Sequence, residues 1–338
     1  MANIRDVAKR AGVTPMTVSR VINNSDYVKT ETRERVEAAI AELNYVPNLL
    51  GQSLRFKQSN TIGLLIPDIA NPYWVTVIRG AEKIASDNGY QVILCNSDGS
   101  EAKELAQLET LIKKQIDGFL IAPIRNLPGP IEFVQKQRIP IVVIGYPMPD
   151  IDVDVVRCDG EAAAYTIVKV LVELGHRRIA ALTGPENIVT ARERVAGYKH
   201  ALAEAGIPID EELIQYGHFH TRQGYEMAQA MLRLDPRPTA VFTGNNLIAI
   251  GVTKALEAEG IRVPQDISIV TFDGPPPDLV VDPFFTMVSQ PGYDLGTHAT
   301  ELLLQRFKNE ADSPCQDVIL PTQVIKYSST APLQTITA

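Results

Sequence analysis

Apolar residues return at helical spacing at the start of the chain. The apolar positions of a first predicted helix are Ile4, Val7, Ala8 and Ala11. They follow the i, i+3, i+4, i+7 pattern of one helix face, and Asn3 stands at the N-cap. Gly12 interrupts the run, and Thr14 and Pro15 mark a second helix, because threonine caps helices and proline at the first position loses no hydrogen bond.

Two further apolar stripes complete a small helical domain. The stripe of the second helix is Val18, Val21 and Ile22. A third helix is expected from about Thr30 to Asn44, with Thr30 as its cap, because apolar residues there repeat the 3.6-residue period. Three such helices can enclose a core of Val7, Val18, Val21, Val36 and Ile40. This is typical of the helix-turn-helix, whose second helix enters the major groove of DNA; a plain helical hairpin is the alternative that the spacing leaves open.

The second helix presents a different set of side chains opposite its apolar stripe. Arg20 can pair bidentately with O6 and N7 of guanine, while Pro15 and Met16 offer apolar contact to thymine methyl groups. We expect the DNA contacts of this motif to come from Thr14, Pro15, Met16, Thr17, Ser19, Arg20 and Asn23.

From Thr61 onward, short apolar runs alternate with helical stretches such as NPYWVTVIRGAEKIASDNG and TARERVAGYKHALAEAG. Runs rich in Ile and Val suit strands buried on both faces of a parallel sheet. The expected strands are TIGLLI, QVILCN, GFLIAP and IPIVVIG in a first half and RRIAALTG, TAVFTG and DISIVTF in a second. The order is βαβ throughout, which predicts an α/β fold with two halves.

Two α/β halves imply a cleft between them. In open parallel sheets, ligands bind at the carboxyl ends of the strands. The segments that fall there are 67–73, 184–194, 244–246 and 272–274. A small-molecule site is therefore expected where these segments meet.

Charge is divided unevenly along the chain. Residues 1–58 hold nine Lys and Arg against six Asp and Glu, which gives this segment a net charge of +3. Because the whole chain has a net charge of −8, the remaining residues carry a net charge of −11. An acidic body cannot wrap DNA, which places the DNA contacts in the N-terminal segment. A single module of +3 would bind weakly, and this favours a dimer that presents two of them.

Other features exclude several classes of protein. The three cysteines, Cys95, Cys158 and Cys315, contain no C-x-x-C pair, which suits a reducing cytosol. No signal peptide opens the chain and no apolar run approaches the roughly 18 residues of a membrane span. We therefore expect a cytoplasmic protein without membrane attachment.

No common catalytic motif occurs in the chain. His218 and His220 stand at strand spacing and could share a face as metal ligands, but no third ligand lies near them in the sequence. Ordinary, partly exposed histidines are the simpler interpretation. We expect no enzyme activity, no metal and no cofactor.

The chain resembles the lac-repressor (LacI/GalR) family through IRDVAKRAGVTPMTVSRVIN, ETRERVEAAIAELNYVPN and TIGLLIPDIANPYW. Further matching stretches, reaching to about residue 328, are RERVAGYKHAL, RPTAVFTGNN, VPQDISIVTFD and SQPGYDLG. The resemblance implies an all-α helix-turn-helix domain, a hinge helix and a periplasmic-binding-protein-like core of two doubly wound parallel-sheet subdomains. The implied boundaries are 1–46 for the DNA-binding domain, 47–59 for the hinge and linker, 60–159 with 291–321 for the N-subdomain, 160–290 with 322–328 for the C-subdomain, and 329–338 for a tail.

The resemblance also assigns roles within the hinge. Relatives form a helix there that enters the minor groove and inserts a leucine between base steps. Leu54 occupies the matching position, with a flexible linker as the alternative, and Arg55 and Lys57 flank it as expected contacts to the DNA backbone. Gly51 stands where relatives usually carry alanine.

In the core, the resemblance implies effector contacts from Tyr73, Arg194, Phe219, Asn245, Asp273 and Gln290. Arg194 belongs to an R-x-x-G-[YF] motif, and its guanidinium can donate a fork of hydrogen bonds to hydroxyls or a carboxylate. Asp273 resembles the aspartate that accepts hydrogen bonds from ligand hydroxyls in sugar-responsive relatives. The residues alone leave open a surface salt bridge for Arg194, a loop cap for Asp273 and core packing for the aromatic rings.

Departures from the family pattern narrow the range of possible ligands. Many relatives carry Asn-Asp where this chain has Asn245 and Asn246, and Asp-Arg where it has Gly145 and Tyr146. The purine-responsive branch has an arginine in place of Ile188. A small polar ligand other than a purine is therefore expected, such as a sugar, a sugar acid or a sugar phosphate.

Together, these features predict a homodimeric transcriptional repressor that binds a pseudo-palindromic operator in double-stranded DNA. Its affinity would change when a small polar metabolite, a sugar or sugar derivative, closes the cleft. The chain shows no C-terminal heptads, so a leucine-zipper tetramer is not expected. The alternative from another class is a cytosolic carbohydrate-binding protein or sugar-modifying enzyme with a vestigial N-terminal domain.

Overall fold

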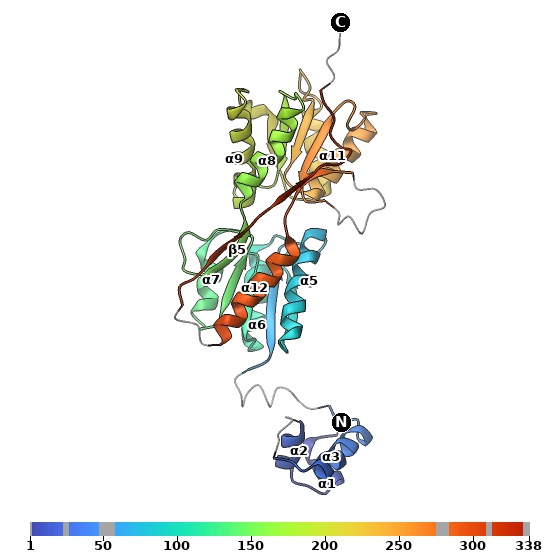
Figure 1. Cartoon of the computed structure of the whole chain (residues 1–338), viewed down its shortest axis with the longest axis vertical. Helices are drawn as coiled ribbons and strands as arrows, with labels where there is room; N and C mark the ends of the chain where they lie inside the picture. Colours follow the sequence, from blue (N-terminus) through green and yellow to red (C-terminus); the bar gives the residue numbers. More distant parts are fainter. Residues whose placement is uncertain (1, 23–26, 47–57, 275–283, 309–312, 334–338) are drawn as a thin grey trace. The chain divides into compact units, whose positions relative to one another are not determined.

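The computed structural model describes residues 2–22, 27–46, 58–274, 284–308 and 313–333 (Figure 1). The chain divides into two compact units, Met1–Ser59 and Asn60–Ala338. We call them the N-terminal unit and the core unit.

The N-terminal unit contains three helices, α1 (Ile4–Ala11), α2 (Pro15–Ile22) and α3 (Thr30–Glu42). Its core is the predicted one: Val7, Val18 and Val36 are fully buried, and Ile40 packs against them half-buried.

Local capping fixes the ends of the first two helices. The Asn3 side chain accepts hydrogen bonds from the backbone N–H groups of Arg5 (2.9 Å) and Asp6 (3.2 Å), and Asp6 accepts one in return from the N–H of Asn3 (2.9 Å). Gly12 ends α1 with φ +65°, a left-handed conformation that glycine adopts at little cost. The Thr14 hydroxyl accepts from the N–H of Thr17 at 3.2 Å.

The start of α3 differs from the expectation. Thr30 is the first helical residue and not the cap, which is Lys29, and no side chain caps this helix. Lys29 has an extended backbone (φ −60°, ψ 144°) and its carbonyl already accepts the N–H of Arg33, so the first helical turn starts one residue earlier than threonine capping predicts. The helix also ends at Glu42, two residues before Asn44.

The core unit has two lobes, each built on a six-stranded sheet. The first lobe has the strand order β11-β5-β4-β3-β1-β2 and the second the order β12-β10-β9-β8-β6-β7. The strands of the first lobe are β1 (Thr61–Ile66), β2 (Gln91–Asn96), β3 (Gly118–Ile121), β4 (Ile141–Ile144), β5 (Asp154–Cys158) and β11 (Asp317–Leu320). Those of the second are β6 (Ile179–Thr183), β7 (Ile214–Tyr216), β8 (Ala240–Thr243), β9 (Ser268–Phe272), β10 (Thr286–Ser289) and β12 (Gln323–Ile325).

Helices cover both sheets (Figure 1). The helices of the first lobe are α5 (Pro72–Asp87), α6 (Glu101–Lys113), α7 (Pro128–Gln135) and α12 (Gly292–Phe307), and those of the second are α8 (Gly160–Glu173), α9 (Val189–Glu204), α10 (Thr221–Met231) and α11 (Asn246–Ala258). A 3₁₀ turn spans Glu211–Leu213. The α5 and α12 backbones approach closely, because a Cβ at Gly80 or Gly296 would lie 2.0 Å from a carbonyl oxygen of the facing helix.

All seven predicted strands are present, and the α/β class with two parallel sheets is confirmed. In the part of the chain that the structure describes, the expectation of βαβ order is wrong in two places. β4 leads to β5 without a helix, and β11 leads directly to β12, which pairs antiparallel with β10. Strands β5, β11 and β12 were not predicted, because β5 carries Asp154 and Arg157 and the other two contain exposed positions. They therefore lack the continuous apolar run of a central strand.

The chain passes between the lobes three times. It leaves the first sheet after β5 for α8, returns from β10 to α12, and crosses again between β11 and β12. Beyond β12 it continues along the second sheet, where the fully buried Ser329 hydroxyl accepts from the N–H of Thr286 (2.8 Å) and donates to the carbonyl of Ile269 (2.7 Å). Among the described residues, no helix is long and apolar enough to span a membrane.

Candidate functional site

The exposed face of α2 holds the expected DNA contacts that the structure describes. Thr14, Pro15, Met16 and Arg20 are exposed, with Met16 at 57%, while Thr17 and Ser19 are half-buried. The Thr14 and Thr17 hydroxyls lie 3.0 Å apart and share a hydrogen bond at the start of the helix. The remaining candidates, Asn23, Leu54, Arg55 and Lys57, lie outside the described residues, as does Gly51.

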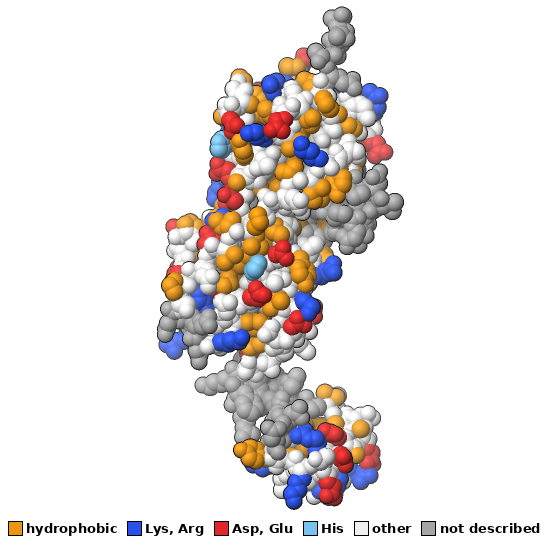
Figure 2. Space-filling model, in the orientation of Figure 1, with side chains coloured by type: hydrophobic (Ala, Val, Ile, Leu, Met, Phe, Trp, Pro, Cys, Tyr) orange, Lys and Arg blue, Asp and Glu red, His pale blue; other side chains and the backbone are white. Residues whose placement is uncertain are grey.

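The core unit carries charges of both signs on the face shown in Figure 2. On the face shown in Figure 2, the Lys and Arg side chains of the described residues are interspersed with Asp and Glu. This mixed surface offers little attraction to a nucleic-acid backbone.

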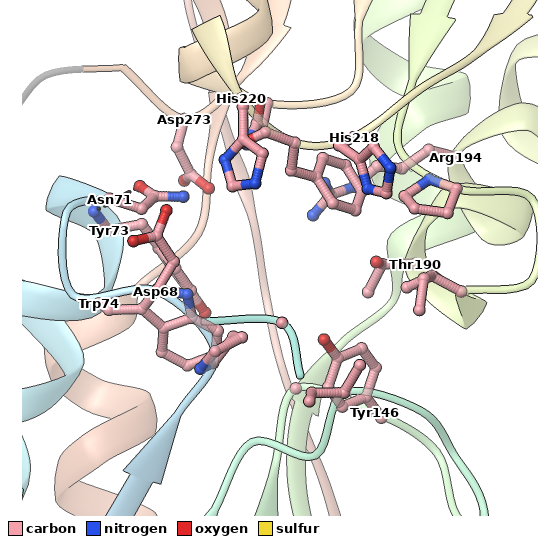
Figure 3. A pocket seen from close by; sticks show the side chains of 18 of the residues that line it. Asp68, Asn71, Tyr73, Trp74, Tyr146, Thr190, Arg194, His218, His220 and Asp273 are labelled. Atoms are coloured by element: carbon pink, nitrogen blue, oxygen red, sulfur yellow. Dashed lines mark hydrogen bonds between the residues drawn. The ribbon is translucent and has the colours of Figure 1, made fainter. Parts of the chain in front are cut away.

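A cavity of about 190 Å³ lies between the two lobes of the core unit. All four segments expected at the strand ends contribute to its lining, including Asp68, Arg194, Asn245 and Asp273. Figure 3 shows Asp68, Tyr73 and Trp74 of the first lobe facing Arg194, His218 and Thr190 of the second. The carboxyl ends of both sheets therefore meet at one site between the lobes, as strand polarity predicts.

Arg194 is buried in α9, with 8% of its surface exposed. Its Nη1 donates to the carbonyl of Gly244, and its guanidinium carbon lies 4.0 Å from the ring centroid of Phe272 and 5.8 Å from that of Phe219. Its Nε has no hydrogen-bond partner among the described residues. Burial lowers the pKa of Arg194, an effect that the nearby Asp273 carboxylate opposes. This side chain is a buried cation facing a cavity and not a surface salt bridge.

Asp273 follows β9 in a left-handed conformation (φ +52°) that is uncommon outside glycine. Its carboxylate accepts hydrogen bonds from the backbone N–H of Gln290 (2.9 Å) and from Nε2 of the same residue (2.7 Å). Burial raises the pKa of Asp273, while the Gln290 bonds and Arg194 lower it. Gln290, at the second crossing of the chain, thus orients the carboxylate. Asp273 therefore both binds the backbone at Gln290 and lines the cavity.

Asn245 is the N-cap of α11. Its Oδ1 accepts from the N–H of Ile248 (2.9 Å) and its Nδ2 donates to the carbonyl of Phe219 (3.4 Å). Half of the hydrogen-bonding capacity of the Asn245 amide is therefore used within the protein, and one N–H and one lone pair of Oδ1 remain for a ligand.

Aromatic rings line both walls of the cavity. Tyr73 and Trp74 meet edge-on with centroids 5.0 Å apart, and Phe219 lies in the opposite wall. Tyr146, at the end of β4, is 7% exposed, and burial raises its pKa to about 12. The hydroxyl is therefore neutral at physiological pH and can both donate and accept a hydrogen bond.

Several lining residues were not singled out from the sequence as contacts. They are Asp68, Asn71, Trp74, Tyr146, Thr190, His218 and His220. Tyr146 follows a predicted strand directly, so the strand-end rule that selected the other segments could have found it. The rings of His218 and His220 stack at 6.2 Å, and the described residues contain no cluster of three potential metal ligands.

Comparisons with known proteins identify the same family for the N-terminal unit and for the core unit. Residues 3–48 match the family described as bacterial regulatory proteins, lacI family, and residues 59–328 match periplasmic binding proteins and the sugar binding domain of the LacI family. The ribose operon repressor of Escherichia coli is 36% identical over 307 residues, which cover 90% of this chain and 93% of the repressor.

Solved structures show the same similarity. The lac repressor dimer bound to operator and the anti-inducer ONPF is 30% identical, with a TM-score of 0.84 over 98% of this chain and 99% of that chain. A LacI-family regulator from Enterococcus faecium with bound ribose is 32% identical, with a TM-score of 0.72 over 81% of this chain and 100% of that one. The helix-turn-helix, the two-lobed core and these matches together show that the chain belongs to the LacI family of bacterial transcriptional regulators.

Proposed function

We propose that this chain acts as a homodimeric repressor whose affinity for a pseudo-palindromic operator is set by a sugar or sugar derivative bound between the lobes of the core. The observation that carries the proposal is the presence, in one chain, of an exposed recognition face on α2 and a cavity between two lobes that is lined by a buried guanidinium and a buried carboxylate. A repressor acts where its operator is, so the proposal places the protein in the cytoplasm.

In the DNA complex, Arg20 contacts a guanine edge and its neighbours on α2 set the local fit, because their side chains point away from the domain core. Arg55 and Lys57 contact phosphates, and Leu54 acts as the minor-groove wedge that the family resemblance implies. Each unit of a dimer supplies one such module to one half-site.

In the cleft, Arg194 donates to ligand oxygens and Asp273 accepts from ligand hydroxyls. A buried donor fork beside a buried acceptor suits a polyol with neighbouring hydroxyl groups. Tyr73 and Phe219 offer flat apolar surfaces to the C–H face of such a ligand. The regulator from E. faecium was solved with ribose, which makes a pentose the first compound to test.

Dimer formation is supported by the edge of the first sheet. β2 is its outermost strand and contacts α5, and each element carries an exposed apolar side chain, Ile93 on β2 (36%) and Val75 on α5 (43%). Exposed apolar side chains along a sheet edge suit burial against a second subunit. The similar lac repressor was solved as a dimer on its operator.

The proposal is tested by selecting operator sequences with the purified protein and then screening sugars, sugar acids and sugar phosphates for release. A repressor gives a specific complex whose affinity falls steeply with salt and changes with one of these compounds. A carbohydrate-binding protein or enzyme with a vestigial N-terminal domain would bind the metabolite but form no specific complex. The relatives are named as repressors and regulators, which supports the first outcome.

A further inference from the structure

Among the described residues, a polar contact and an apolar contact bridge the lobes. The polar contact joins Asn71 of the first lobe to Asn246 of the second: Nδ2 of Asn246 donates to Oδ1 of Asn71 at 3.1 Å. These residues are 175 positions apart in the chain. Asn71 caps α5 and Asn246 is the first residue of α11, so the bond joins two helix N-termini on opposite sides of the cleft.

Local geometry fixes the acceptor of this bond. Oδ1 of Asn71 also accepts the backbone N–H of Tyr73 at 3.0 Å, as the N-cap of α5. The amide of Asn71 cannot turn over without losing that cap, because its nitrogen is a donor only. The acceptor presented to the other lobe is therefore set by the helix that follows it.

The donor is buried more deeply than the acceptor. Asn246 is 1% exposed, and its Oδ1 has no hydrogen-bond partner among the described residues. A buried amide left without partners costs free energy, since it gives up its hydrogen bonds to water. The bond to Asn71 is the hydrogen bond that the side chain of Asn246 makes in this conformation.

The apolar contact is formed by a separate cluster. Ile124, just after β3 in the first lobe, packs with Ile188 and Ala191 of the second lobe, and Phe219 lies against them. Asn71, Ile124, Ile188 and Phe219 also line the cavity. Both contacts therefore form only when the lobes come together around the ligand site.

We propose that the Asn71–Asn246 hydrogen bond is a latch that holds the lobes closed, and that Asn246 is a positioning residue that sets effector affinity through closure. In an open cleft both side-chain amides would form hydrogen bonds with water. In the closed cleft the two amides form a hydrogen bond with each other, in a region of low dielectric constant. Apparent ligand affinity scales with the fraction of closed molecules, so loss of the latch weakens binding. The inference rests on the proposed function in one respect, that an effector binds between the lobes.

The first experiment needs no ligand. Hydrogen exchange is compared by mass spectrometry in the full-length parent and the Asn246→Ala variant. The latch predicts faster exchange in both lobes, including first-lobe peptides that cover residues 71–78 and 120–125. A merely local role for Asn246 at the start of α11 would speed exchange in the second lobe alone, and that result would overturn the proposal.

Two further variants make the test specific. Asn71→Ser keeps a good helix cap, but its side chain is too short to reach across the cleft. Its hydrogen exchange should therefore be as fast as that of Asn246→Ala. The double variant should exchange no faster than either single variant. Asn88→Ala is the matched control, because Asn88 Nδ2 donates to Ile84 within the first lobe (2.8 Å) and lies on the surface. Additive effects of the two latch variants would show that the residues act independently, against the proposal.

The second experiment uses D-ribose as the probe and the fluorescence of Trp74, the one tryptophan of the chain, as the signal. Asn246→Ala should raise the Kd about three- to tenfold, the range expected for one neutral hydrogen bond. Asn246→Asp should raise it further, because it sets a carboxylate against the acceptor of Asn71. An unchanged Kd in both variants would refute the latch. If ribose does not bind the parent protein, ribose is not the ligand, and the exchange measurement still decides whether the latch exists.

Discussion

The two units of this protein place their functional side chains in opposite ways. On α2, the expected DNA contacts lie within about two helical turns and are exposed or half-buried. In the core unit, Arg194 and Asp273 are buried, and the cavity they face is lined by segments from residue 67 to residue 290. A surface formed by one helix depends little on the rest of the protein, whereas a site between two lobes depends on how the lobes pack. Substitutions in the two regions should therefore separate DNA binding from its control.

The largest expected effect is complete loss of control. Arg194→Ala and Asp273→Ala should abolish the response to the metabolite while the protein still binds its operator, because allosteric control requires a ligand that binds two states differently. The measurement is operator binding with and without the metabolite. Arg192→Ala, at an exposed position on the same helix, is the matched control and should keep the response. A variant that loses DNA binding but still binds metabolite would reverse the assignment of the two regions.

Arg20→Ala should have the next largest effect, on the DNA side. Loss of a bidentate base contact is expected to cost about 1 to 3 kcal/mol on the preferred operator and to relax selection at one position in each half-site. Lys57→Ala should weaken specific and random duplexes alike. Arg10, which pairs with Glu42 at 2.7 Å on the surface of the N-terminal unit, offers a matched control. Equal losses on both duplexes for Arg20→Ala would remove its role in base recognition.

Asn3→Ala should destabilise the N-terminal unit by about 1 kcal/mol, because it removes a capping box. The effect should stay within that unit, and thermal unfolding followed by hydrogen exchange can show whether it does. Asn3→Ser, which retains a capping oxygen, should recover most of the loss. A parallel loss of stability in the core unit would mean that the two units unfold together.

The smallest expected effect is a dependence of core stability on pH. The buried His176 contacts the Thr239 hydroxyl (2.9 Å) and the Ala331 carbonyl (3.1 Å), and burial lowers its pKa below the usual value of 6.5. The unfolded chain then binds a proton more readily, so the stability that the neutral ring contributes is present above pH 6.5 and is lost as the pH falls through the folded-state pKa. Denaturant unfolding of the core between pH 7.5 and 5 should show this loss, and His176→Gln should reduce it. All five histidines lie in the core unit, so the stability of the N-terminal unit should not depend on histidine protonation.

Local patterns in the sequence were sufficient for much of this architecture. The periodic stripes of α1 and α2, the caps at Asn3 and Thr14, and the apolar runs of the central strands all concern residues within a few positions of one another. Such patterns act through the local backbone and one buried face, and so they can be recognised before any tertiary contact is known. The strand-end rule then located the four segments of the cleft, because parallel strands that begin at one edge of a sheet must end at the other.

Only the tertiary structure decided how those segments meet. The edge strands β11 and β12, the contacts of Arg194 with two phenylalanine rings and the bond from Gln290 to Asp273 join residues far apart in the sequence. The Asn71–Asn246 pair spans 175 positions, and neither asparagine differs in its local sequence from an ordinary helix start. The sequence by itself determined the helices of the N-terminal unit and the central strands of the two sheets, since their apolar patterns are local. The packing of the two lobes determined which side chains face one cavity, since those contacts exist only after long loops have closed.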